Sequence, residues 1–170
     1  MELNEFKNRI LPLKDKLFRF ALSILHSRED AEDLIQEVLL KVWKHESFFE
    51  RIENPPAYCM TITKNMALDR LRQAHRKTPH LSVEQHDVAD EQTPVEKLQQ
   101  HERHRLVKQL IKRLPLNQQL LIQLRDIEGE SYKQIACLLN ISESKVKINL
   151  FRARQLLKER IKNIHAYGQL

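Results

Sequence analysis

Apolar side chains recur at intervals of three and four residues along most of this chain, and that spacing is typical of amphipathic helices. The pattern covers residues 3–26, 31–43, 57–76 and 95–161. Only two glycines, Gly129 and Gly168, occur among 170 residues, which argues against the many tight turns of a β-sheet protein. Leu, Ile, Lys, Glu, Gln and Arg dominate the composition and favour helices. The sequence therefore predicts an all-α fold.

Prolines and polar segments mark where the predicted helices end. Pro12 should kink or divide the first helix, and Pro55 and Pro56 stop the second helix from continuing into the third. Residues 78–94 are polar, acidic and bounded by prolines, and they show no sustained period. We expect this segment to be a flexible linker.

The helix over residues 31–43, AEDLIQEVLLKVW, has an inner side and an unusual outer side. Its inner apolar stripe consists of Ala31, Leu34, Ile35, Val38 and Val42. The outer side carries Asp33, Gln36, Glu37 and Leu40. Acidic residues in the first turn suit the positive end of a helix. That effect does not account for Gln36, Glu37 and Leu40, which lie further along, so the outer side needs another explanation.

The third predicted helix runs from about Ala57 to about Arg76. Its predicted apolar stripe is Tyr58, Ile62, Met66 (or Leu68) and Leu71. Its polar groups mix amide, acidic and basic chemistry: Lys64, Asn65, Asp69, Arg72, Arg76 and Lys77. Such a surface could hold splayed bases and a strand backbone. A helix end closed by salt bridges explains the same residues equally well.

Residues 131–161 predict a helix-turn-helix, preceded by a helix that Pro115 begins and Gly129 ends. Ser131 and Gln134 form a capping-box pattern at the start of a short helix. That helix buries Ile135, Ala136 and Leu139. A tight turn, NIS, follows, and Ser142 can cap the final helix. The inner stripe of the final helix is Val146, Leu150, Ala153, Leu157 and Ile161.

Positive charge is concentrated at the C-terminal end of the chain. Residues 105–170 hold 13 Lys and Arg against 5 Asp and Glu, a net charge of +8, whereas residues 1–78 carry +2 and residues 79–104 carry −4. This asymmetry is typical of a nucleic-acid-binding domain. A solvated basic surface on an all-helical protein is the alternative.

The final helix is the candidate recognition helix. The first turns of such a helix face base edges in the major groove, and later basic residues reach phosphates. Lys145, Lys147 and Ile148 are placed for bases, and Arg152 could contact either a base or a phosphate. Arg154 and Lys158 are expected to contact phosphates.

Signs of catalysis, cofactors and export are missing from the sequence. It has no glycine-rich phosphate loop, no HExxH and no GxSxG motif, so we expect no catalytic residue, no cofactor and no small-molecule substrate. Cys59 and Cys137 lie far apart without ligand spacing, which predicts buried, reduced thiols and no metal site. The opening MELNEFKNRI is no signal peptide, and no apolar run approaches membrane length. We expect a cytoplasmic protein without membrane insertion.

Three segments in order resemble the extracytoplasmic-function (ECF) group of bacterial RNA polymerase sigma factors. They are AEDLIQEVLLKVW, AYCMTITKNMALDRLR and, after LP, LLIQLRDIEGESYKQIACLLNISESKVKINLFRARQLL. The resemblance covers nearly the whole chain. It implies two small helical domains joined by the flexible acidic linker, the second being the helix-turn-helix. It assigns residues 1–78 to polymerase docking and to −10 recognition and melting, 79–104 to the linker, and 105–170 to −35 recognition.

The resemblance also implies roles for individual residues. The core polymerase-binding residues would be Asp33, Gln36, Glu37 and Leu40, on a helix that docks on a coiled coil of the largest catalytic subunit. The loop over residues 47–57 would capture a flipped −10 base. The −10 DNA-binding residues would be Tyr58, Lys64, Asn65, Asp69, Arg72 and Arg76. The −35 DNA-binding residues would be Ser144, Lys145, Lys147, Ile148, Phe151, Arg152 and Arg154.

The implied partners are core RNA polymerase, promoter DNA and an anti-sigma factor. Lys145 stands where the family usually has a small, Thr-like residue, and Asn149 stands where it often has Arg, so the resemblance does not give the −35 sequence. Two other functions fit parts of the chain. One is a dimeric helix-turn-helix repressor, which would leave the first domain without a role. The other is a nucleic-acid-processing enzyme.

Overall fold

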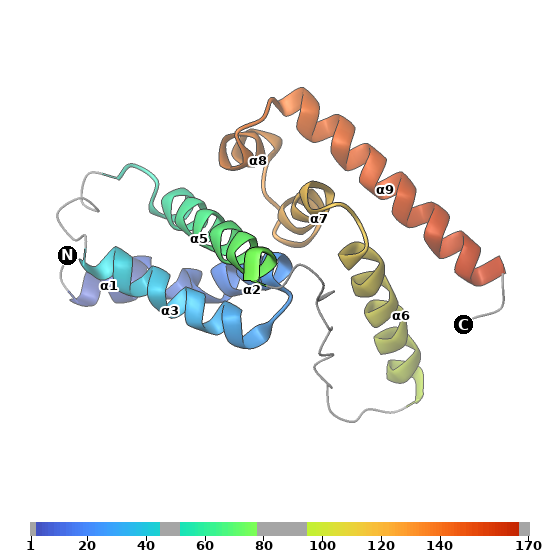
Figure 1. The fold of residues 1–170 in the computed structure, drawn as a ribbon, viewed down its shortest axis with the longest axis horizontal. Coiled ribbons are helices and arrows are strands. Elements are labelled where there is room, and N and C mark those ends of the chain that lie inside the picture. The colour runs from blue at the N-terminus through green and yellow to red at the C-terminus, as the bar shows by residue number, and fades with distance from the viewer. Residues whose placement is uncertain (1–2, 45–51, 78–94, 167–170) are drawn as a thin grey trace. The chain divides into compact units, whose positions relative to one another are not determined.

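The computed structural model describes residues 3–44, 52–77 and 95–166. All regular elements in these ranges are helices, as the periodicity predicts (Figure 1). The chain divides into two compact units, residues 1–86 and residues 87–170. The linker predicted over 78–94 lies outside the described residues.

The first unit is built from helices α1, α2, α3 and α5 with a short 3₁₀ turn, η1. Their bounds are Leu3–Arg9 for α1, Leu11–Leu13 for η1, Lys14–Leu25 for α2, Arg28–Lys44 for α3 and Pro55–Lys77 for α5. Pro12 lies within η1 and divides the first helix, which confirms the prediction. His26 ends α2 with a left-handed φ of 56°. Ser27 then caps α3, because its hydroxyl accepts a hydrogen bond from the backbone N–H of Asp30 at 3.3 Å.

The core of the first unit lies where α2, α3 and α5 pack together. The predicted stripe of α3 is confirmed, and its five residues are fully buried: Ala31, Leu34, Ile35, Val38 and Val42. Helix α2 contributes the large side chains Leu17, Phe20 and Ile24, also fully buried. Burial of an aliphatic or aromatic side chain of this size contributes about 1.5–3 kcal/mol to folding. The contacts between α2 and α3 therefore hold α3 in a fixed orientation.

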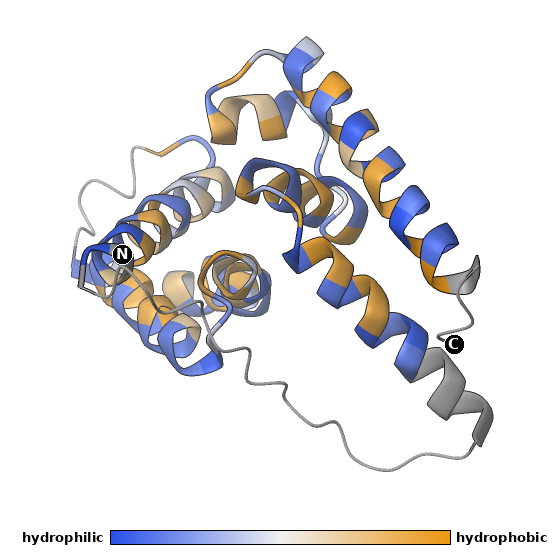
Figure 2. Cartoon of the chain, turned by 45° about the vertical axis from the view of Figure 1, so that its right-hand side comes forward, coloured by the Kyte–Doolittle hydropathy of each residue, from blue (hydrophilic) through white to orange (hydrophobic). Residues whose placement is uncertain are grey.

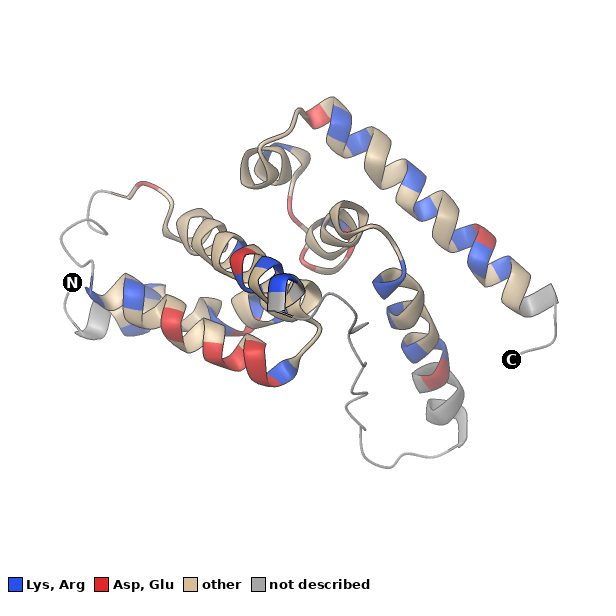
Figure 3. Ribbon diagram, viewed as in Figure 1, with Lys and Arg blue, Asp and Glu red and all other residues tan. Residues whose placement is uncertain are grey.

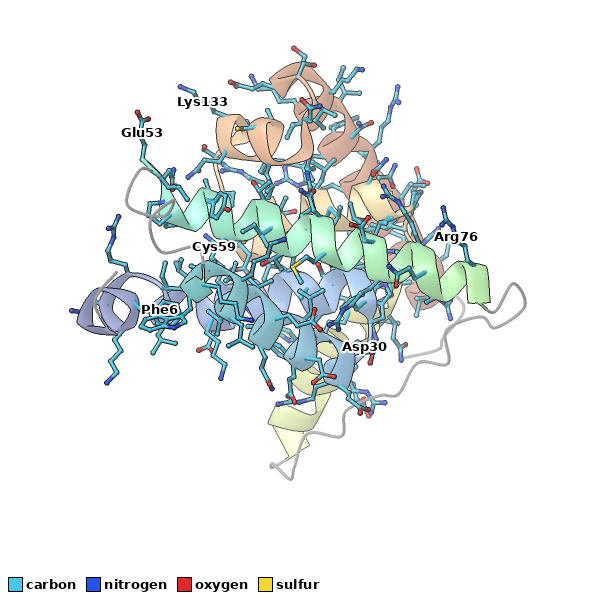
Figure 4. All side chains as sticks on the ribbon, turned by 60° about the vertical axis from the view of Figure 1, so that its left-hand side comes forward. Phe6, Asp30, Glu53, Cys59, Arg76 and Lys133 are labelled. Atoms are coloured by element: carbon cyan, nitrogen blue, oxygen red, sulfur yellow. The ribbon has the colours of Figure 1, made fainter. Side chains whose placement is uncertain are left out.

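The predicted apolar stripe of α5 is wrong. Tyr58, Ile62, Met66 and Leu71 are only half-buried. The core-facing residues are Cys59, which is labelled in Figure 4, and Met60, Thr63 and Ala67. Small side chains at three of these positions let α5 approach α2 and α3 closely. The Thr63 hydroxyl can be buried because it donates to the backbone carbonyl of Cys59 at 2.8 Å. The packing face of α5 therefore consists largely of small side chains and one buried hydroxyl, which a pattern of large apolar residues does not reveal.

The described residues of the second unit form helices α6, α7, α8 and α9 and a π-helical turn, η2. Their bounds are Val95–Lys112 for α6, Leu116–Ile122 for α7, Gln123–Ile127 for η2, Tyr132–Leu139 for α8 and Glu143–Ala166 for α9. Helix α6 begins at Val95, as the apolar period over 95–161 predicts, and it includes the last ten residues of the segment 79–104 that the resemblance calls the linker. Gln119 closes the corner between α6 and α7, since its amide nitrogen donates to the carbonyls of Lys112 at 3.0 Å and Leu114 at 2.7 Å.

Helices α8 and α9 form the predicted helix-turn-helix. Ser131 and Gln134 make both hydrogen bonds of the capping box, at 3.2 and 2.8 Å. Asn140 makes the turn with a left-handed φ of 54°, and Ser142 caps α9 at the backbone N–H of Lys145. Apolar and polar bands alternate along α9 (Figure 2). Its inner residues Val146, Leu150 and Ala153 are fully buried, and Leu157 and Ile161 are half-buried.

Candidate protein and nucleic-acid interfaces

The outer face of α3 is exposed along its whole predicted set of contact residues. Asp33, Gln36, Glu37 and Leu40 all lie on the side opposite the buried stripe. Leu40 is 57% exposed and has no core to enter. An apolar side chain within a polar rim is the usual composition of a protein interface. We call these four residues the α3 outer face.

Arg70 on α5 forms an ion pair with Glu37 of the α3 outer face. Its guanidinium lies 2.6 Å from the Glu37 carboxylate and donates to the backbone carbonyl of Asp30 at 2.9 Å. Sequence reasoning missed this residue. A signal was available, because Arg70 shares the helical spacing of the buried Thr63 and Ala67. A charged residue on a core-facing side needs a partner.

Trp43 is a second residue that sequence reasoning missed. It lies one turn after Leu40 on α3 and is 38% exposed. Its ring meets the Phe6 ring edge-on, with centroids 5.2 Å apart and planes at 82°. Aromatic pairs favour this geometry. The pair joins α1 to the last turn of α3 and extends the apolar part of that surface beyond Leu40.

The exposed face of α5 gathers most of the predicted −10 contacts. Asn65, Asp69, Arg72 and Arg76 recur at spacings of four and three on the side away from the core, and all four are exposed. Arg76 lies near the C-terminal end of α5, and Glu53 lies just before its first turn (Figure 4). Asp69 and Arg72 form an exposed ion pair at 3.0 Å.

Two predicted −10 residues differ from the rest of that face. Tyr58 is half-buried at the start of the same side, and Lys64 is half-buried on its flank. Of the predicted base-capturing loop, residues 47–51 lie outside the described residues. The described part is ordered by Asn54, whose side-chain oxygen accepts from the backbone N–H of Ala57 at 3.1 Å and so caps α5.

Helix α9 combines basic and apolar side chains on its outer surface. Lys and Arg recur along its length (Figure 3). Ser144, Ile148 and Arg152 point away from the buried stripe, as does Phe151. Ile148 is 51% exposed and Phe151 is 63% exposed. Apolar side chains in this position can contact thymine methyl groups in the major groove.

The first predicted base contacts of α9 are exposed, and one of them lies against an aromatic ring. Lys145 and Lys147 are both exposed. The Lys147 ammonium lies 5.6 Å from the ring centroid of Tyr132 on α8, and the Arg125 guanidinium lies 4.7 Å from the same centroid. Both distances suit cation–π attraction.

Arg154 is the one predicted phosphate contact that has a strong partner inside the protein. Its Nε donates to Asp126 Oδ2 at 3.2 Å, and its Nη2 forms a short ion pair with Asp126 Oδ1. These hydrogen bonds raise the pKa of Arg154 above its ordinary value. The guanidinium therefore stays charged but directs its fork at a carboxylate of η2.

Comparison with known proteins assigns both units to one family. Residues 10–77 match the family Sigma-70 region 2, and residues 104–157 match Sigma-70, region 4. The chain is 31% identical over 143 residues to ECF RNA polymerase sigma factor SigL of Mycobacterium tuberculosis, covering 84% of this chain and 80% of that protein. It is 29% identical over 148 residues to ECF RNA polymerase sigma factor SigX of Bacillus subtilis, covering 84% and 76%. The chain belongs to the ECF RNA polymerase sigma factors.

A solved structure agrees with this assignment. The sigma factor RpoE of Bartonella quintana, crystallised in complex with the anti-sigma factor NepR, superposes with a TM-score of 0.77 at 27% identity. The match covers 94% of this chain and 98% of that one. As a sigma factor, the chain binds core RNA polymerase and promoter DNA and directs transcription initiation. Within the described residues, no helix has the length and apolarity needed to cross a membrane.

Proposed function

We propose that three helix faces divide the work of initiation in this sigma factor. The α3 outer face docks on core RNA polymerase, the exposed face of α5 holds the opened −10 strand, and the outer side of α9 reads the −35 duplex. One observation carries the proposal: on each helix, nearly all the proposed contact residues lie opposite or beside the buried stripe and remain exposed. Each face is therefore available to a partner without any change in the fold.

Docking through α3 explains why Leu40 is exposed. A single leucine surrounded by Asp33, Gln36 and Glu37 can enter an apolar pocket on a partner while the polar rim bonds around it. The proposed partner is the coiled coil of the largest catalytic subunit. The acidic bias of the rim favours a basic partner surface.

Strand capture by α5 would provide the free energy for melting. Unstacking a base costs on the order of a few kcal/mol, and a pocket for the extruded base offsets that cost. Asn65 can pair with a base edge through its amide, whereas Arg72 and Arg76 suit the strand backbone. The protein itself performs no bond chemistry in this scheme, because catalysis belongs to the polymerase.

Duplex reading by α9 uses both kinds of side chain on its surface. Lys145, Lys147 and Arg152 carry donors for base edges or phosphates, and Ile148 and Phe151 carry apolar surface for thymine methyls. We also propose that the protein acts in the cytoplasm and that an anti-sigma factor controls it. The complex of the similar RpoE with NepR supports an anti-sigma partner.

Transcription with purified components tests the proposed function. The chain would be added to core RNA polymerase and genomic DNA, and the 5′ ends of the transcripts would be mapped. New start sites sharing −10 and −35 elements are expected only when the chain is present. A set of starts that does not change with the chain would contradict the proposal. A chain that stays dimeric and ignores core polymerase in solution would indicate the repressor instead, and metal-dependent cleavage of the DNA would indicate the enzyme.

A further inference from the structure

We propose that Asp126, Arg154 and Tyr132 form a brace that sets the rotation of α9, and that Arg154 acts on promoter binding through this brace rather than by contacting a phosphate. The inference rests on the proposed role of α9 in reading the −35 element. It makes Arg154 and Asp126 positioning residues for recognition by this sigma factor.

The anchor of the brace is the π-helical turn η2. The backbone N–H of Glu128 donates to the carbonyl of Gln123 at 2.9 Å, five residues back, and the Gln123 amide nitrogen donates to the Glu128 carboxylate at 3.0 Å. The Arg125 guanidinium donates to the carbonyl of Glu130 at 2.7 Å. Gly129 closes the turn with a φ of 73°, which favours glycine. Asp126 therefore projects from a segment held by several independent bonds.

The brace holds α9 at two points. Asp126 binds Arg154 through two hydrogen bonds, and a bidentate pair fixes the angle of a guanidinium as well as its distance. Seven residues earlier, Lys147 lies over the ring of Tyr132, and Arg125 of η2 lies within cation–π distance of the same ring. A spacing of seven residues puts Lys147 and Arg154 on the same flank of α9.

The two points lie on either side of the central part of the proposed reading segment. Ile148, Phe151 and Arg152 all fall between Lys147 and Arg154. The buried stripe beneath them fixes which side of α9 faces the core. Apolar packing is non-directional, however, so it tolerates small rotations of the helix more readily than directional bonds do. The directional bonds to η2 and α8 supply this additional resistance to rotation. They fix where the reading side chains point.

Arg154 is also poorly suited to bind a phosphate. Its charge is already balanced by a carboxylate, and its Nε and Nη2 are both used. Lys158 lies one turn later, is exposed and faces the same general side of α9. Lys158 is therefore the matched control for the loss of one positive charge from this part of the helix.

The test measures how holoenzyme binds the promoter found by start-site mapping, across a salt series. Lys158→Gln is expected to lower the slope of log K against log salt by about one, because one phosphate contact is lost. Arg154→Gln is expected to leave that slope unchanged. It should weaken specific binding roughly fivefold, which is the size of effect that loss of an exposed ion pair allows. It should also lower the ratio of the affinity for a promoter with an intact −35 element to the affinity for one with a scrambled −35 element.

The variant Asp126→Asn distinguishes the two roles of Arg154, because they predict opposite changes in promoter affinity. Removing a negative charge near DNA and freeing Arg154 should strengthen binding if Arg154 could contact a phosphate. The brace predicts weaker specific binding and lower −35 preference instead. The exchange Asp126→Arg with Arg154→Asp should restore part of that preference, although it moves a carboxylate onto α9. Circular dichroism of each variant checks that it is folded.

Different results would contradict the role of α9 in reading DNA and the role of the brace. If Arg152→Ala leaves promoter binding unchanged, α9 does not read DNA and the proposed function of that helix is wrong. If Arg152→Ala weakens binding but Arg154→Gln lowers the salt slope as Lys158→Gln does, and Asp126→Asn tightens binding, only the brace is overturned.

Discussion

The guanidinium of Arg70 on α5 lies 2.6 Å from the carboxylate of Glu37 on α3, so a residue of the proposed −10 helix holds a residue of the proposed polymerase face. The Glu37 side chain is still 56% exposed and can accept a further partner. Arg70 therefore orients Glu37 without covering it. If Glu37 belongs to the docking surface as proposed, its substitution should change both the stability of the first unit and its binding to polymerase.

The first prediction concerns that pair. Glu37→Lys should lower the free energy of unfolding by up to about 1 kcal/mol, because the ion pair is lost and two cations face each other. Glu37→Gln should have a smaller effect. In a double-mutant cycle with Arg70→Gln, thermal denaturation should give a coupling of about 0.5 kcal/mol. Additive effects of the two substitutions would show that the pair is not formed in solution.

The second prediction separates docking from folding. Leu40→Ala should leave the melting temperature nearly unchanged, since substitutions of exposed residues usually stay within about 0.5 kcal/mol. It should clearly reduce capture of core polymerase. Leu11 on η1 is also exposed, at 40%, and Leu11→Ala is the matched control. Equal capture by both variants would remove Leu40 from the docking surface.

The third prediction distinguishes the two thiols. The sequence predicted that both would be buried, but only Cys59 is; Cys137 on α8 is exposed, because its position faces away from the short helix's core. Burial raises the pKa of Cys59 to about 11. Iodoacetamide at pH 8 should therefore label Cys137 in the native protein and Cys59 only after denaturation, as read by mass spectrometry. Labelling of native Cys59 would show that α5 opens readily.

The same pKa shift predicts how stability depends on pH. Below about pH 9 the Cys59 thiol is protonated in both states, and its contribution to stability is complete. Between about pH 9 and 11 the unfolded thiol ionises while the folded one does not. The free energy of unfolding should therefore fall by up to about 1.4 kcal/mol per pH unit in that window. Urea titrations of wild type and Cys59→Ala should differ in this slope.

The fourth prediction separates strand opening from duplex binding. Asn65→Ala should spare polymerase binding and the closed complex but impair opening, because its amide is proposed to hold an extruded base. Arg152→Ala should weaken the closed complex itself. A template with a pre-melted −10 bubble should largely rescue Arg152→Ala and should not restore base selectivity to Asn65→Ala. Permanganate footprinting and run-off transcription would show both effects, and identical responses would refute the division.

The features that were predicted correctly from the sequence depend on short, regular spacings between residues. The stripe of α3 and the caps at Ser131 and Ser142 depend on residues no more than one or two turns apart, so local spacing reveals them. Helix α5 was misread because Thr63 and Ala67 carry little hydropathy although they are fully buried. Its packing is determined by side-chain size, which a hydrophobic pattern does not record.

The pairs that matter most for the interfaces were beyond local spacing. Arg70 reaches α3 across 40 residues of sequence, and Arg154 reaches η2 across 28. No periodicity connects positions so far apart, so the sequence left Arg154 as a phosphate contact. The roles of individual residues in binding remain predictions, whereas their exposure is a property of the fold.

The π-helical turn at Gln123–Ile127 has a consequence for recombining such proteins. A π turn carries one residue more than the equivalent α turn, and each extra residue rotates the rest of the same helix by about 100°. Deleting one residue there would let α7 run on as an ordinary helix and would swing Asp126 out of phase with Arg154. A chimera that joins this recognition helix to another sigma factor should therefore be spliced before Gln123. A junction that lost one residue of the turn would keep every −35-reading residue but would break the Asp126–Arg154 pair that we propose to position them.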